Sequence, residues 1–217
     1  MSLGAWGWAW AYAMVPMMAW ASEARVEQGN VVIAGPDGVV RTLTRSGLDR
    51  DANASPDGRW VAFIRAYPAS GADGTGRTEL RVVASAGGME RILARSGETC
   101  GENPRLDGLS NPQFLGDSRQ IVFESLFVVT SGSVQRVSTD GGACRYIAAA
   151  NDVLVVRGGE YRDALILSQH RYFLGGGSYD WYWLFDSEGR EVGPIGDDEA
   201  AVAAFLETFD SSPGAEH

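Results

Sequence analysis

The chain alternates short apolar runs with tight polar turns, and this pattern predicts β-strands over most of its length. The sharpest example is the stretch ASPDGRWVAFIR, in which a Ser55-Pro56-Asp57-Gly58 turn precedes an apolar strand. Pro56 favours a type I turn, Asp57 can accept hydrogen bonds from nearby amides, and Gly58 supplies backbone freedom. Residues 60–64 are apolar on both faces of the strand, which predicts protein packed above and below it.

The turn and the strand recur further along the chain. When Phe123 is aligned with Phe63, Asp117 falls on Asp57. A second element, a short apolar stretch before a glycine turn, recurs at Gly38, Gly88, Gly142 and Gly189. The steps between these glycines are 50, 54 and 47 residues. Such spacing is typical of hairpins repeated in the blades of a radial β-structure.

The SPDG-RWVAF run, followed by an ELRVV strand and a Gly-Gly turn, resembles the TolB-type WD-like β-propeller repeat. The full pattern covers residues 54–93. The copy at 114–147 has Leu115-Gly116 in place of Ser-Pro, and the copy at about 151–195 keeps only strand periodicity and a Glu-Gly turn. The family includes a periplasmic partner of outer-membrane lipoproteins and the propeller halves of prolyl-oligopeptidase-type enzymes. The resemblance therefore implies a fold and little about activity.

We expect an all-β fold, a β-propeller of about three and a half to four blades, incomplete or open, with a short C-terminal α-helix. The predicted blades span residues 52–94, 111–148 and about 151–195, and residues 30–44 supply only the two outer strands of a first blade. Closed propellers usually have four or more blades. Either the missing strands come from elsewhere, or the array stays open with its end covered, and an open edge would allow a homodimer. An irregular open β-structure is the alternative.

The two ends of the chain differ from the repeats. Residues 1–21 carry no charge and end in Ala-Trp-Ala, which is typical of a cleaved export signal, although the positive n-region is missing. A retained membrane anchor and an apolar segment of the fold are the alternatives. We expect the propeller domain to span 22–196 in a periplasmic or otherwise exported protein, with no membrane insertion after cleavage. In the C-terminal helix and tail, residues 197–217, one helix face is apolar, made of Val202, Phe205, Leu206 and Phe209. This face is expected to dock on its own propeller, with a partner or a second copy as the alternative.

Composition narrows the function classes. The 217 residues are 45% hydrophobic, enough for one domain with a substantial core. The formal net charge of −10 repels phosphate backbones, so no nucleic-acid partner is expected. The only histidines are His170 and His217, and no metal, cofactor or nucleophile motif is present. Cys100 or Cys144 could form a catalytic thiol–imidazole pair with His170, but no sequence motif of such an enzyme accompanies them. We therefore expect no cofactor and no enzymatic activity.

The two cysteines of an exported chain suggest a disulfide between Cys100 and Cys144. The predicted blades place Cys144 beside a short turn and Cys100 in a long connection on the other rim. A disulfide needs Cα atoms within about 7 Å. Two unpaired thiols are therefore the alternative.

Long connections gather on one rim of the predicted propeller. They are Ala66–Thr78, Ser96–Ser110 and Gln169–Asp180, and long loops on a rigid scaffold often carry binding residues. The candidates on this long-loop face are Tyr67, Arg77, Arg105, Arg171, Tyr172, Phe173 and Tyr179. We expect an exported, non-enzymatic propeller that binds a protein or cell-envelope partner through this face. The alternatives are an accessory propeller of a separate peptidase-type enzyme and an enzyme with its site in the central channel.

Overall fold

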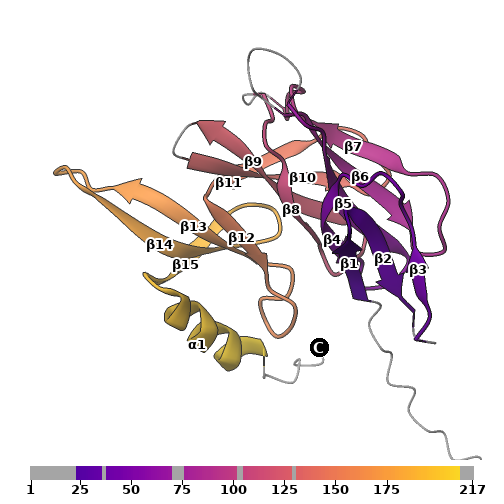
Figure 1. Cartoon of the computed structure of the whole chain (residues 1–217). Helices are drawn as coiled ribbons and strands as arrows, with labels where there is room; N and C mark the ends of the chain where they lie inside the picture. The colour runs from indigo at the N-terminus through magenta and orange to yellow at the C-terminus, as the bar shows by residue number, and fades with distance from the viewer. Residues whose placement is uncertain (1–22, 36–37, 70–75, 102–104, 129–130, 211–217) are drawn as a thin grey trace, which may run out of the picture.

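The computed structural model describes residues 23–35, 38–69, 76–101, 105–128 and 131–210. The expected export signal and the tail beyond residue 210 lie outside the described residues. The described chain folds into four antiparallel β-sheets followed by one α-helix (Figure 1). Each sheet is one blade, so the predicted all-β propeller with a short C-terminal helix is confirmed. Among the described residues, no helix is both long and apolar enough to cross a membrane.

Blades 2, 3 and 4 each contain four strands, which follow one another in chain order across the sheet. Blade 2 consists of β4 (Asp49–Ala54), β5 (Trp60–Ala66), β6 (Thr78–Ala84) and β7 (Arg91–Arg95). Blade 3 consists of β8 (Ser110–Phe114), β9 (Gln120–Val128), β10 (Ser131–Ser138) and β11 (Arg145–Ala149). Blade 4 consists of β12 (Asp152–Val155), β13 (Leu165–Tyr172), β14 (Ser178–Phe185) and β15 (Glu191–Gly196).

Blade 1 has three strands, β1 (Glu23–Glu27), β2 (Asn30–Ala34) and β3 (Val40–Thr42). The prediction that only two strands precede blade 2 was therefore wrong by one strand, β1. In β1, Ala24 and Val26 are half-buried and alternate with exposed charged residues. Because its inward side chains are small, β1 gives a weak apolar signal, and pairing with β2 is what fixes it as a strand.

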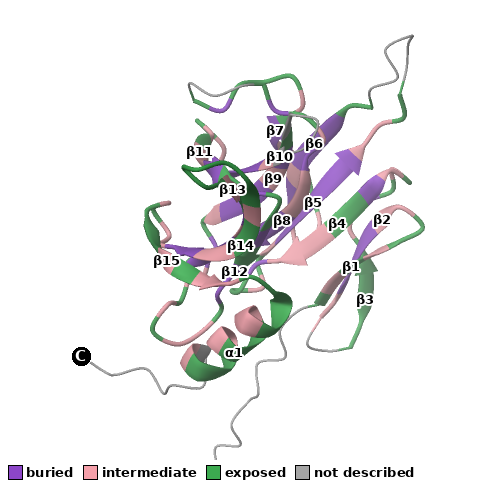
Figure 2. Ribbon diagram, turned by 90° about the vertical axis from the view of Figure 1, so that its left-hand side faces the viewer, coloured by how far each residue is buried: buried purple, intermediate pink, exposed green. Residues whose placement is uncertain are grey.

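The blades form an open array. Strand β1 contacts β4, β4 contacts β8, and β8 contacts β12, so these four strands lie along the inner edge. Figures 1 and 2 both place blade 1 and blade 4 at opposite ends of the array. The curve is therefore an arc whose first and last blades are separate.

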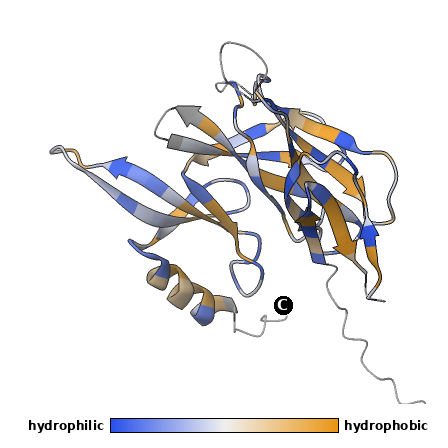
Figure 3. Cartoon of the chain, viewed as in Figure 1, coloured by the Kyte–Doolittle hydropathy of each residue, from blue (hydrophilic) through white to orange (hydrophobic). Residues whose placement is uncertain are grey.

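Apolar side chains fill the space between neighbouring blades. In β5, Phe63 packs toward blade 1 and Ile64 packs toward blade 3, and both side chains are 0% exposed. The expectation that this strand has protein on both faces is confirmed. In Figure 2 the buried residues follow the central strands, and in Figure 3 the most hydrophobic segments lie in the same strands.

The two end faces of the array are covered in different ways. On blade 4, α1 (Glu199–Asp210) packs Val202, Phe205 and Leu206 against the sheet. The Phe209 ring lies 5.0 Å from that of Tyr161, so all four predicted apolar residues face the helix's own propeller. On blade 1, charged and polar side chains cover the outward face, including those of Glu23, Arg25, Glu27, Asn30 and Thr42.

A disulfide joins Cys100 to Cys144, whose Cα atoms are 4.8 Å apart. Cys100 is 1% exposed and lies in the core between blades 2 and 3, where Cys144 and Trp60 also pack. The connection that follows β7 thus carries Cys100 back to the start of β11. The two cysteines are therefore close together, although the sequence suggested that they lie on opposite rims of the propeller.

The Ser-Pro-Asp-Gly turn connects β4 to β5 and also contacts the next blade. Gly58 N–H donates to Ser55 O at 2.8 Å, and Arg59 N–H donates to Asp57 Oδ1 at 3.0 Å. Asp57 N–H donates to Ser118 Oγ at 3.1 Å in the equivalent turn of blade 3. Burial raises the pKa of Asp57, but hydrogen bonds from Ser55, Arg59 and Ser118 outweigh it and lower the pKa.

That second turn repeats the chemistry of the first. Asp117 Oδ1 accepts from Arg119 N–H at 2.8 Å. Ser118 occupies the position equivalent to Gly58, and the two residues have φ of 58° and 68°. The turn conformation is therefore retained although a residue with a side chain replaces glycine.

Candidate functional site

One predicted pair of binding residues lies on the connection between β5 and β6. Tyr67 N–H donates to Arg77 O at 2.8 Å, and the Arg77 guanidinium lies 4.3 Å from the centre of the Tyr67 ring. The Tyr67 hydroxyl donates to Glu79 Oε2 at 3.2 Å. Tyr67 and Arg77 thus form one local cluster at the edge of blade 2.

Behind this cluster, blade 2 carries a buried ion-pair network on its face toward blade 1. Arg65 bonds Asp49 Oδ1 at 2.6 Å and Glu90 Oε2 at 2.7 Å. Arg81 bonds Glu79 Oε2 at 2.5 Å and Glu90 Oε2 at 2.7 Å. Burial raises the pKa of Glu79, but the Arg81 guanidinium outweighs it and lowers the pKa. Because the Asp49 side chain is 0% exposed, removal of its Arg65 partner would leave a buried carboxylate without its compensating charge.

Arg105 lies in the connection between β7 and β8. Its Nε donates to Gly97 O at 2.9 Å, and its backbone pairs with that of Thr99. The side chain is exposed and supports the backbone of its own connection. A binding role for Arg105 remains a prediction.

The remaining predicted residues gather on the β13–β14 hairpin. On one side of it, β12 pairs only with Leu165–Ser168, and on the other, β15 pairs only with Tyr182–Phe185. The outer half of the hairpin, residues 169–181, is therefore a two-stranded ribbon that extends beyond the rest of blade 4 (Figure 1). We call this segment the outer ribbon.

One face of the outer ribbon carries a row of aromatic rings. Ring centres are 4.6 Å apart for Phe173 and Tyr179, and 6.1 Å apart for Tyr179 and Trp181. Trp183 continues the row at 6.4 Å from Trp181. The Arg171 guanidinium lies 3.5 Å from the centre of the Trp183 ring and closes the inner end of the row by a cation–π contact.

Hydrogen bonds hold the base of this row. Arg171 Nε donates to Gln169 Oε1 at 2.9 Å, and its Nη2 donates to Glu191 Oε2 at 2.6 Å. Gln169 Nε2 in turn donates to Ala149 O of blade 3 at 2.6 Å. The rings therefore stand on a base that is held by hydrogen bonds to β15 and to the neighbouring blade.

The opposite face of the outer ribbon is more polar. His170 Nδ1 and Asp180 Oδ1 are 2.8 Å apart across the two strands, and the Tyr172 ring lies edge-on to His170 at 5.0 Å. At the tip, Tyr172, Phe173 and Leu174 are 77%, 58% and 111% exposed. Large apolar side chains thus project into water at the end of the paired strands.

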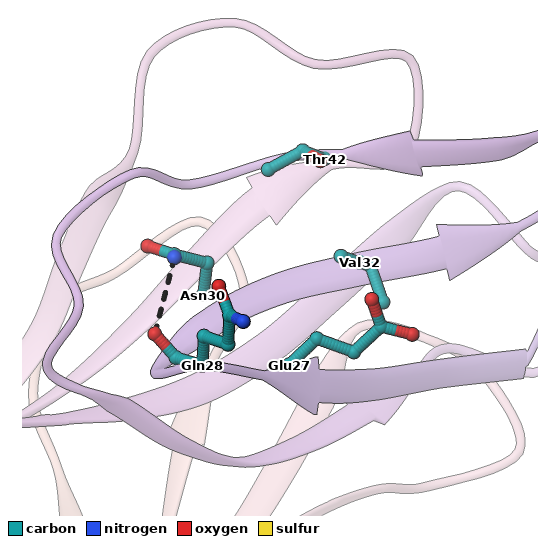
Figure 4. Close-up of a pocket in the computed structure, with 5 residues that line it drawn as sticks. All are labelled: Glu27, Gln28, Asn30, Val32 and Thr42. Atoms are coloured by element: carbon teal, nitrogen blue, oxygen red, sulfur yellow. Dashed lines mark hydrogen bonds between the residues drawn. The ribbon is translucent and has the colours of Figure 1, made fainter.

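Two hollows among the described residues lie away from the outer ribbon. The larger, of about 540 Å³, lies on the outward face of blade 1 and is lined by Glu27, Gln28, Asn30, Val32 and Thr42 (Figure 4). In it, Asn30 Nδ2 donates to Gln28 O at 3.2 Å. The other, of about 340 Å³, lies at the short turns between blades 3 and 4. Within the described ranges, no group of three His, Cys, Asp or Glu side chains could hold a metal ion.

No protein-family model matches the chain, and no curated protein sequence matches it. Several solved structures are similar to the chain. A TolB-type protein from Agrobacterium tumefaciens superposes with a TM-score of 0.51 at 20% identity, over 82% of this chain and 64% of that one. The chain has a TolB-type β-propeller fold.

The TolB-type fold also occurs in peptidase structures. Dipeptidyl peptidase 4 of Porphyromonas gingivalis matches with a TM-score of 0.51 at 14% identity, over 82% of this chain and 31% of that one. The tricorn protease matches with a TM-score of 0.52 at 9% identity, over 79% of this chain and 21% of that one. This TolB-type propeller therefore spans between about a fifth and two thirds of these proteins. At such identities the likeness shows the fold alone.

On this TolB-type propeller, the structure brings together four of the residues predicted for the long-loop face. Arg171, Phe173 and Tyr179 share the aromatic face of the outer ribbon, and Tyr172 lies on its other face. Tyr67 and Arg77 form a separate cluster on blade 2.

Sequence reasoning missed Trp181 and Trp183, which continue the aromatic row, and the His170–Asp180 pair. The hydropathy scale ranks Trp, Tyr, His and Arg as hydrophilic, so much of the outer ribbon is pale or blue in Figure 3. The signal that could have found the row is the alternation of Tyr179, Trp181 and Trp183, because residues two apart share one face of a strand.

Proposed function

We propose that this chain is an exported, non-enzymatic propeller that binds a protein partner of the cell envelope, and that the outer ribbon makes the central contact. The observation that carries the proposal is the row of rings on a projecting strand pair with an apolar tip. Leu174 is 111% exposed and Phe173 is 58% exposed. Apolar side chains held in water in this way are typical of a surface that a partner covers.

The composition of the outer ribbon fits a protein interface. Trp, Tyr and Arg are the side chains that most often dominate binding energy at protein interfaces. Here Arg171, Tyr179 and Trp181 occupy neighbouring positions on one face, and hydrogen bonds hold the base of the row. A preorganised surface loses little side-chain entropy when a partner binds.

The chemistry of the described residues supports a binding role over a catalytic one. The two cysteine sulfur atoms of the chain are bonded to each other, so neither Cys100 nor Cys144 supplies a thiolate nucleophile. His170 lies beside Asp180 and Tyr172, and within the described residues its hydrogen-bond partner is the Asp180 carboxylate and not a hydroxyl or thiol of the kind that covalent catalysis activates.

The second candidate function is an accessory propeller of a separate peptidase-type enzyme. It is favoured by the fold likeness to dipeptidyl peptidase 4 of Porphyromonas gingivalis. In this case the partner held by the outer ribbon is itself a peptidase, so the identity of the captured protein separates the two candidates.

The test is a pull-down from an envelope fraction with the intact protein as bait. The double variant Phe173→Ala/Trp181→Ala should reduce recovery of the captured protein at least tenfold. Met89→Ala is the matched control, because Met89 is 92% exposed and lies after the Gly-Gly turn on the short-turn rim. Equal recovery with both variants would contradict the assignment of the outer ribbon. Turnover in a broad hydrolase and lyase screen would contradict the non-enzymatic role.

A further inference from the structure

Both edges of the outer ribbon lack a partner strand in the described chain, and the β14 edge is the one that continues the line of β15. Strand β15 pairs with β14 from Phe185 to Tyr182, where Gly196 is the last partner, and the chain then turns away into α1. The line that β15 follows along β14 is therefore vacant beside residues 178–181. An unpaired strand edge is a template for an added strand.

Some backbone N–H and C=O groups of β14 point toward this vacant line. Phe173 N–H donates to Gly177 O, so the backbone groups of Gly177 face β13. Successive residues in a strand alternate in direction. Ser178 and Asp180 therefore direct their N–H and C=O groups away from β13, toward the vacant line.

The side chains of β14 give this edge two chemically different faces. On one face, Tyr179 and Trp181 would lie directly opposite the side chains of an added strand. The distance of 6.1 Å between their rings is close to the repeat of about 6.7 Å between same-face side chains of an extended strand.

The other face of the vacant line is acidic. Asp180, which also contacts His170 across the ribbon, lies on this face, and Asp198 and Glu199 at the start of α1 act electrostatically on Tyr182, where β15 ends. Burial and these carboxylates together raise the pKa of Tyr182. An added strand with basic side chains on this face would meet complementary charge.

We propose that the β14 edge of the outer ribbon binds an extended segment of a partner protein as an added β-strand, in line with β15. The segment carries apolar side chains toward the aromatic face and basic side chains toward the acidic face, in alternation. Its backbone pairs with Ser178 and Asp180. This inference rests on the proposed function, and it names the chemistry of the partner.

The test uses a fluorescein-labelled peptide, Lys-Val-Arg-Val-Lys-Val-Arg, and a shuffled peptide in which the three Val residues are contiguous. By fluorescence anisotropy, the alternating peptide should bind the intact protein at least tenfold more tightly than the shuffled peptide. Equal affinities of the two peptides would show that binding depends only on their net charge, and would overturn the proposal.

Two variants at one position separate backbone pairing from side-chain contact. Asp180→Ala and Asp180→Pro both remove the carboxylate, but only proline removes the outward N–H. Proline is tolerated in an edge strand when its nitrogen faces solvent. Asp180→Pro should bind the alternating peptide at least fivefold more weakly than Asp180→Ala, and equal affinities would exclude strand addition. Met89→Ala should bind like the wild type.

Hydrogen exchange provides a readout that needs no variant. The alternating peptide should slow exchange of the Ser178 and Asp180 amides at least tenfold, while amides in blade 1 exchange unchanged. Unchanged exchange at both residues would overturn the proposal. If the peptide fails but envelope capture still depends on Phe173 and Trp181, the proposed function stands and only strand addition fails.

Discussion

The disulfide between blades 2 and 3 should supply a large share of the stability of this protein. It closes a segment with a sequence separation of 44, and the loss of chain entropy in the unfolded state for a loop of this length corresponds to about 4 kcal/mol. Domains are commonly stable by about 5–15 kcal/mol. Removing the cross-link should therefore leave a folded but much weaker protein.

The assay is equilibrium unfolding in urea of the oxidised wild type, the reduced wild type and the double variant Cys100→Ala/Cys144→Ala. Reduction and substitution should lower the free energy of unfolding by similar amounts, about 3–5 kcal/mol. The variant should lose slightly more, because Cys100 is 1% exposed and its sulfur packs in the core. A difference below about 1 kcal/mol between oxidised and reduced protein would refute the entropic reasoning. Two titratable thiols in the native protein would refute the cross-link itself.

Three further measurements test the interior and the turns. Arg65→Ala removes the ion-pair partner of the Asp49 carboxylate, which is 0% exposed, and should lower the free energy of unfolding in urea by about 3–5 kcal/mol. The control Arg190→Ala breaks an exposed pair and should lower it by less than about 0.5 kcal/mol. Equal losses in the two variants would contradict the role of burial. Asp57→Ala should cost about 1 kcal/mol through lost turn hydrogen bonds without changing envelope capture, and a stable variant that no longer captures its partner would show a binding role. The pKa values of Asp57 and Glu79 are lowered in the folded protein, so their stabilisation is present at neutral pH and is lost as the pH falls below about 4; a melting temperature that does not fall between pH 7 and pH 3 would contradict it.

The strands that are packed between two neighbouring blades were predictable because their pattern of apolar residues is local and periodic. Phe63 and Ile64 lie on opposite faces of one strand, and apolar residues on both faces can only mean two packed neighbours. The Ser-Pro-Asp-Gly turn and its second copy fixed the spacing between blades 2 and 3. Each predicted boundary of blades 2 to 4 lies within three residues of the observed strands.

Features that depend on distant partners were harder to predict. The strand β1 is defined by its pairing with β2, and its small inward residues Ala24 and Val26 carry little apolar signal. The disulfide depends on the path of a long connection, which no local pattern specifies. On the outer ribbon, the sequence predicts a strand through Trp181 and Trp183, and only the end of the β14–β15 pairing at Tyr182 reveals that Trp181 lies beyond the four-stranded part of the blade.

The separation of blade 1 from blade 4 has a consequence for how the molecule comes apart. In a closed ring, every blade has two neighbours, so two blade contacts must break before a blade can separate. In this open array, blade 1 or blade 4 needs to lose only one contact, and the other blades can stay assembled. Such a linear stack loses order from its ends, as solenoid proteins do. The disulfide holds blades 2 and 3 together as a central pair, so we expect blade 4, with the outer ribbon, to open before that pair separates.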